Sequence, residues 1–109
     1  MGITKADLFT EEQNELATLA KAFAHPARIA ILEHLLKTNQ CINSDLVKEL
    51  GLAQATISQH LKELKSIGLI AGTVEGTSMC YCIDDKVWEK VKLQMNQLLN
   101  QKDLLSNTC

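Results

Sequence analysis

The chain has 109 residues, of which 46% are hydrophobic and 22% charged, a balance typical of one globular domain. Its formal net charge of −2 does not in general favour nucleic acid as a partner, although the local distribution of charge matters more than the sum. No apolar run approaches a membrane span, and the N-terminus lacks the basic and apolar regions of a signal peptide. We therefore expect a single cytoplasmic domain over residues 1–109 without membrane contact.

Two helices are predicted in the first third of the chain. Thr10, followed by two glutamates and Gln13, has the pattern of a capping box, which marks a helix start. That helix should end before Pro26, because a residue that precedes proline avoids helical backbone angles. Pro26 suits the first turn of the second helix, which is expected to end near residues 38–39. We interpret residues 40–42 as a brief strand.

A helix-turn-helix pattern occupies residues 45–67. A short helix is followed by a turn at Gly51 and then by a second helix from about residue 53 to 66. Apolar residues at i, i+4 and i+7 give this second helix one buried stripe. Its opposite face carries short hydrogen-bonding side chains, which suit a major groove because they can pair with base edges and phosphates. This face consists of Gln54, Thr56, Ser58, Gln59, Lys62 and Lys65. The alternative is an ordinary helical hairpin with a solvated face.

A β-hairpin over residues 69–83 and a helix over about 85–102 complete the prediction. A hairpin directly after a recognition helix is typical of the wing of a winged helix. The final helix carries an apolar stripe that begins at Val87 and Val91, and so apolar a terminal helix needs a partner. The first helix and a second subunit would supply one, and a two-fold dimer would place two recognition helices in successive major grooves. The predicted fold class is mainly α with a small β-hairpin: a winged helix-turn-helix that dimerises through its first and last helices.

The run AKAFAHPARIAILEHLL, then DLVKELGLAQATISQHLKELKSIGLI and then EGTSMCYCID, resembles the ArsR/SmtB family of bacterial metal- and thiol-responsive repressors. The likeness covers roughly residues 16–84 in one collinear block. It implies a homodimeric repressor that binds a double-stranded DNA operator and leaves it when an inducer binds. His25, Pro26 and Arg28 match a segment of the family that looks structural. The DNA-reading positions implied by the resemblance are Gln54, Thr56, Ser58, Gln59 and His60, with Lys62 toward phosphate.

The sequence departs from the family pattern at three places. Arsenic-sensing members carry Cys-Val-Cys at the first helix of the motif, where this chain has Ile42 and Ser44 at the cysteine positions. Zinc-sensing members use histidines of the last helix, which has none here. Glu75 stands at the wing tip, where members often have a basic residue, so the wing lacks the charge that would favour phosphate contact there. Neither usual metal site is therefore present.

The cysteines suggest a different sensing site. Cys80 and Cys82 alternate with Tyr81 along one strand, so both thiols should point outward if Tyr81 faces the core. Cys41 should also face outward, because Ile42 beside it suits the core. Three soft sulfurs suit a thiophilic inducer such as As(III) or Sb(III), bound by Cys41, Cys80 and Cys82 as thiolates. No other cofactor is indicated.

Other hypotheses remain open. Cys41 could form a redox or persulfide switch with Cys80, Cys82 or Cys109, and Cys109 ranks lowest as a ligand because it is the last residue. Cysteine also often acts as a small hydrophobe without any thiol role. A third class is a winged helix that docks on protein instead of DNA. The sequence has no nucleophile–base pair, phosphate-binding glycine loop or carboxylate pair at a convincing spacing, so we do not expect an enzyme.

Overall fold

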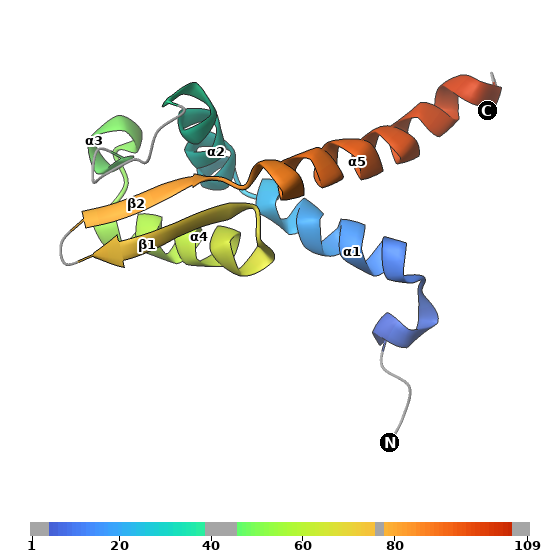
Figure 1. Cartoon of the computed structure of the whole chain (residues 1–109), viewed down its shortest axis with the longest axis horizontal. Coiled ribbons are helices and arrows are strands. Elements are labelled where there is room, and N and C mark those ends of the chain that lie inside the picture. Colours follow the sequence, from blue (N-terminus) through green and yellow to red (C-terminus); the bar gives the residue numbers. More distant parts are fainter. Residues whose placement is uncertain (1–4, 39–45, 76–77, 106–109) are drawn as a thin grey trace.

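The computed structural model describes residues 5–38, 46–75 and 78–105. Helices α2, α3 and α4 and a two-stranded hairpin form the body of the molecule, and α1 and α5 run side by side away from it (Figure 1). The elements in chain order are η1 (Lys5–Leu8), α1 (Glu11–Ala20), η2 (Lys21–Phe23), α2 (Pro26–Thr38), α3 (Leu46–Leu50), α4 (Gln54–Ile67), β1 (Ile70–Glu75), β2 (Ser78–Ile83) and α5 (Asp85–Leu105).

Helix boundaries follow local capping rules. The capping box predicted at the start of α1 is confirmed: the backbone N–H of Thr10 donates to Gln13 Oε1 at 2.9 Å, and the N–H of Gln13 donates to Thr10 Oγ1 at 3.0 Å. Gly68 ends α4 with a φ of 95°, a left-handed conformation that favours glycine. Asp84 caps α5 because its Oδ1 accepts the N–H groups of Lys86 and Val87. The strand predicted at residues 40–42 lies outside the described residues.

The core gathers between α4, α2 and the base of the hairpin. The predicted stripe of α4 is confirmed, because Ile57, Leu61 and Leu64 are each at most 1% exposed. They belong to one buried cluster with Ile31 of α2 and Leu69, the residue before β1. Burial of these side chains holds α4 by one face only, since its other face carries the polar residues.

The hairpin is antiparallel, and its register pairs Gly72 with Tyr81 and Ala71 with Cys82. Tyr81 is 8% exposed and belongs to the core, as the alternation along this strand predicts. Gly72 has no room for a side chain: a Cβ there would lie 2.1 Å from the carbonyl oxygen of Cys80 and 2.7 Å from Cδ1 of Tyr81. The close approach of β2 to Gly72 therefore keeps the two strands tightly paired.

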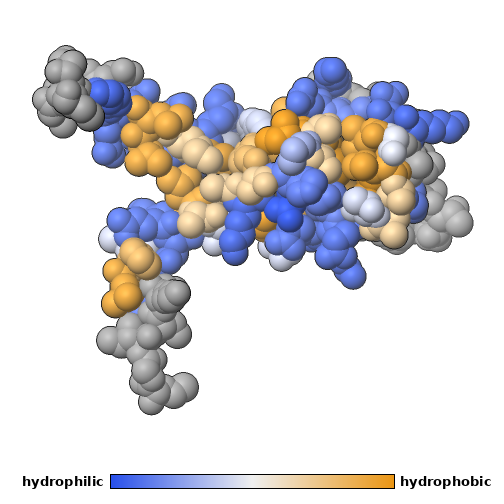
Figure 2. All heavy atoms as spheres, turned by 180° about the vertical axis from the view of Figure 1, so that it is seen from behind, coloured by the Kyte–Doolittle hydropathy of each residue, from blue (hydrophilic) through white to orange (hydrophobic). Residues whose placement is uncertain are grey.

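The projecting part of α5 keeps much of its apolar surface exposed. Val91 is buried and Met95 packs against the core, whereas Leu98 and Leu99 are 53% and 65% exposed. Figure 2 shows apolar surface both on this arm and near the N-terminal 3-10 helix η1. Among the described residues, no helix combines the length and the apolar character that a membrane span requires.

Candidate nucleic-acid interface and thiol face

The outer face of α4 carries most of the residues predicted to read DNA. Gln54, Thr56, Gln59 and Lys62 are exposed, and Ser58 is half-buried. Gln54 Nε2 lies 3.4 Å from Ser58 Oγ, so these two side chains are linked along the helix surface. The face is therefore a continuous row of donors and acceptors held on a helix whose other side is fixed in the core.

The N-terminus of α4 has no side-chain cap. Ala53 occupies the N-cap position with extended angles, φ −63° and ψ 147°, and makes no side-chain hydrogen bond. The first N–H groups of a helix lack intrahelical partners and form the positive end of its dipole. An anion such as a DNA phosphate can accept hydrogen bonds from them. Next to Gln54 and Thr56, this end suits a phosphate of the strand that the helix would read.

His60 is placed differently from the other predicted DNA-reading residues. It is half-buried, and its Nδ1 lies 3.4 Å from Nε of Arg28 on α2. Its ring centroid lies 4.6 Å from that of His25. Burial lowers the pKa of His60 below its ordinary value, and the nearby His25 and Arg28 lower it further. Nothing in the pattern of α4 alone indicated this contact, since it depends on the packing of α2.

A second contact that the sequence did not reveal ties α4 to the wing. Lys65 Nζ donates a hydrogen bond to the carbonyl oxygen of Gly72 at 2.8 Å. From the sequence, Lys65 suggested a phosphate contact or a solvated position. The structure instead uses its ammonium group to join the last turns of the recognition helix to β1.

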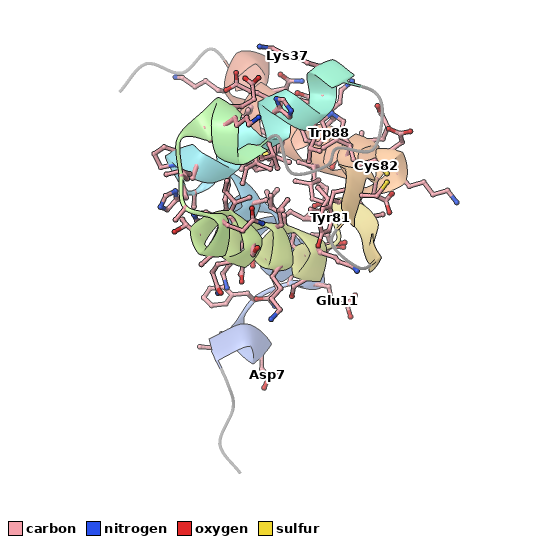
Figure 3. The ribbon with its side chains drawn as sticks, turned by 90° about the vertical axis from the view of Figure 1, so that its left-hand side faces the viewer. Asp7, Glu11, Lys37, Tyr81, Cys82 and Trp88 are labelled. Carbon is pink, nitrogen blue, oxygen red and sulfur yellow. The ribbon has the colours of Figure 1, made fainter. Side chains whose placement is uncertain are left out.

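The thiol face lies on β2. Cys82 is an exposed free thiol, and Figure 3 shows it on the outside of the hairpin while Tyr81 points into the body. Cys80, on the same side of the strand, is half-buried and disulfide-bonded. The second sulfur of that bond lies outside the described residues, as does the predicted ligand Cys41. Among the residues that are described, no group of three or more His, Cys, Asp or Glu side chains could hold a metal ion.

Helices α1 and α5 are joined by a polar cluster that shares Gln94 with a groove between them. Glu15 forms an ion pair with Lys90 and accepts a hydrogen bond from Gln94 Nε2 at 3.2 Å. These contacts lower the pKa of Glu15, the hydrogen bond from Lys90 most of all. The groove is lined in part by Leu16, Gln94 and Leu98, and within the described part of the chain Gln94 Oε1 is buried without a hydrogen-bond partner.

Sequence comparison places this arrangement among known regulators. Residues 25–71 match the model of the family described as bacterial regulatory protein, arsR family. An uncharacterized HTH-type transcriptional regulator of Methanocaldococcus jannaschii is 37% identical over 84 residues, which cover 76% of this chain and 94% of the relative. The HTH-type transcriptional repressor SmtB of Mycobacterium tuberculosis is 39% identical over 67 residues, which cover 62% of this chain but only 49% of SmtB.

Solved structures agree with that relationship. The homodimeric winged helix-turn-helix DNA-binding domain Mb0332 of Mycobacterium bovis superposes with a TM-score of 0.63 at 26% identity, covering 100% of this chain and 95% of its own. The cadmium metal-sensor CmtR of Mycobacterium tuberculosis has a TM-score of 0.53 at 38% identity, covering 65% and 73%. The winged helix-turn-helix fold expected from the sequence is thereby confirmed. The chain belongs to the ArsR/SmtB family of winged helix-turn-helix transcriptional regulators.

Proposed function

We propose that this chain is a homodimeric transcriptional repressor that reads a double-stranded DNA operator with α4. The observation that carries this proposal is the uncapped, polar outer face of α4, on which Gln54, Thr56, Gln59 and Lys62 are exposed. Its relative SmtB is named as a repressor. A regulator works where its operator lies, so we expect a cytoplasmic protein. We also expect it to have no catalytic activity.

The dimer would form through α1 and α5. The exposed leucines of α5, Leu98 and Leu99, need an apolar partner, and Mb0332 is described as homodimeric. A two-fold axis through these helices would carry one recognition helix on each side. The dimer would thus cover the exposed leucines of α5, and the operator would cover the polar outer face of α4.

For the inducer, we propose a thiophilic ion such as As(III) or Sb(III) bound by Cys41, Cys80 and Cys82. The two cysteines of β2 support this proposal, because Cys80 and Cys82 lie on the side of the strand opposite the buried Tyr81. Once the disulfide of Cys80 is reduced, two thiols stand two residues apart on one face of the strand. Three thiolates form a soft donor set that suits such an ion, and binding would release their protons. The similar protein CmtR is described as a cadmium metal-sensor.

The test uses reduced protein. Its probe is a fluorescently labelled DNA duplex, obtained by selecting the sequences that the protein binds from a random-sequence pool. Arsenite should release the wild-type protein from this duplex, and Cys80→Ser and Cys82→Ser should each weaken the release. Cys109→Ser should respond as the wild type does, and a weakened release would put Cys109 in the site in place of Cys41. Full release of the Cys82→Ser variant by arsenite would remove Cys82 from the site. Failure of the wild-type protein to bind any duplex would contradict the repressor itself.

A redox switch is the second candidate, and the same disulfide favours it. Two thiols would pass two electrons and two protons to an oxidant such as a peroxide or polysulfide and become the bond seen at Cys80. The two candidates differ in the reagent that acts. Release by polysulfide together with no response to arsenite would favour the switch, and intact-mass measurement would then show the loss of two hydrogens. A steep salt dependence of DNA binding would exclude a pure protein-docking module.

A further inference from the structure

Arg28 connects three parts of the chain. Its Nη1 donates to the carbonyl oxygen of Lys21, at the junction where α1 passes into η2. Its Nε lies 3.4 Å from Nδ1 of His60 on α4. Arg28 itself belongs to the first turn of α2. One planar guanidinium group therefore spans the end of a helix assigned to the dimer and the middle of the recognition helix.

His25 completes this cluster. Its Nδ1 accepts the backbone N–H of Ala27 at 3.0 Å, which fixes the ring at the start of α2. The ring then lies against that of His60 with an interplanar angle of 50°. The imidazole of His60 is thus enclosed between His25 and Arg28, whereas Gln59 and Lys62 on the same helix are exposed.

We propose that Arg28 and His60 form a joint that sets the orientation of the recognition helix relative to α1, so that His60 positions α4 and does not contact DNA. This inference concerns only the DNA-reading half of the proposed function and is independent of the inducer. It replaces the expectation, drawn from the family resemblance, that His60 belongs to the DNA-reading set.

The joint depends on the protonation state of His60. Nδ1 can accept a hydrogen bond from Arg28 only while it carries no proton. Protonation would turn this acceptor into a donor and place a positive ring beside the Arg28 guanidinium and His25. On its own helix, the nearest charged positions along the chain are Lys62 and Glu63. Burial, together with the nearby His25 and Arg28, lowers the pKa of His60 and so favours the neutral ring, in which Nδ1 can accept the hydrogen bond from Arg28.

Direct phosphate contact and positioning predict opposite pH effects. If His60 touched a phosphate, protonation would strengthen DNA binding, and DNA would raise the pKa of His60. If His60 positions α4 through Arg28, protonation opens the joint and weakens binding. DNA would then lower the pKa of His60 further, because the two equilibria are linked.

The first experiment compares DNA affinity at pH 8 and pH 6 for the wild type, His60→Gln and Arg28→Gln. His34→Gln is the matched control, because His34 is a half-buried histidine of α2 outside this cluster. The duplex is the one selected by the wild-type protein. The affinity of the wild type should fall between pH 8 and pH 6 relative to that of His60→Gln, by at most roughly fourfold per protomer, because a pKa below 6.5 leaves part of the His60 rings neutral at pH 6. Arg28→Gln should remove this difference, and His34→Gln should keep it.

Two further readouts distinguish the alternatives. At pH 6, a lost phosphate contact would reduce the slope of log affinity against log salt by roughly one per protomer in His60→Gln, whereas the joint predicts no such reduction. An NMR titration of the His60 ring in the wild-type protein serves if a variant does not fold. A pKa that rises on addition of the duplex, or a gain of wild-type affinity at pH 6 relative to His60→Gln, would overturn the proposal. Absence of DNA binding by the wild type would instead contradict the proposed function.

Discussion

Substitutions at Ala53, the uncapped start of α4, should change the stability of the fold and the affinity for DNA in different ways. Ala53 has the extended angles of an N-cap residue but no side chain able to accept a hydrogen bond. Ser or Asp at this position would accept a backbone N–H of the first turn, which stabilises a helix by about 1 kcal/mol. We therefore expect Ala53→Ser and Ala53→Asp each to raise the free energy of unfolding by about that amount. For a domain of this size the melting temperature should rise by roughly 4–8 °C.

Ala53→Asp should weaken DNA binding although it stabilises the fold. If a phosphate lies at this helix end, a carboxylate about 5 Å from it costs about 1 kcal/mol even at the dielectric constant of water. Two recognition helices in a dimer double this to about 2 kcal/mol, or roughly a 30-fold loss of affinity. Ala53→Ser adds no charge, so it should bind DNA within a few-fold of the wild type.

The assay is a fluorescence-anisotropy titration of the selected duplex, with thermal melts of the free proteins at equal concentration. Lys37→Gln is the charge control, because it makes the same one-unit change in net charge at an exposed position far from α4 (Figure 3). If Ala53→Asp and Lys37→Gln weakened binding equally, only net charge would matter and the start of α4 would not lie at a phosphate. If Ala53→Ser failed to stabilise the fold, the inferred helix start would be wrong.

Three other predictions concern the stability of the fold. Gly72→Ala should destabilise the protein by at least about 1–3 kcal/mol in chemical denaturation, because its Cβ would meet the carbonyl oxygen of Cys80 at 2.1 Å, and an unchanged midpoint would contradict this packing. Leu64→Ala should cost about 2–5 kcal/mol, since Leu64 is 0% exposed, and a smaller loss would mean that the core closes around the gap. Lys90 lowers the pKa of Glu15 in the folded state. The ion pair therefore stabilises the fold at pH values above the ordinary Glu pKa of 4.5, and this stabilisation is lost as the pH falls through the lowered pKa. Below about pH 5, the melting temperature should therefore fall less steeply with pH for Glu15→Gln than for the wild type. Parallel curves would exclude the ion pair as a cause of the acid destabilisation.

Local rules were enough to predict the order of the α-helices and of the two hairpin strands. The capping box at Thr10, the proline at the start of α2 and the stripe of α4 each depend on residues within one or two turns, which is why the sequence alone revealed them. Alternation along β2 predicted that Tyr81 would be buried and Cys82 exposed for the same reason.

Contacts between distant elements were not accessible in that way. Residues 28 and 60 are 32 positions apart, so the pattern of α4 gave no sign that His60 turns toward Arg28. A lysine side chain has several rotatable bonds, and its sequence position does not determine which oxygen it reaches, as Lys65 illustrates. The prediction of a three-cysteine site is still open, because Cys41 lies outside the described residues.

Besides its buried stripe, the recognition helix has two polar contacts with other elements, and each connects it to a different part of the fold. Near its end, Lys65 is bonded to the carbonyl of Gly72, and Gly72 pairs with Tyr81, the residue between Cys80 and Cys82. A ligand that drew these two cysteines together would therefore strain the strand pair to which α4 is attached. At its middle, the helix contacts Arg28 through His60, and Arg28 reaches the end of α1. A change at the thiol face and a change at the dimer helices would thus reach α4 by separate routes. The variants Lys65→Met and Arg28→Gln would interrupt one route each, so an inducer that acts at β2 should lose its effect in the first variant and keep it in the second.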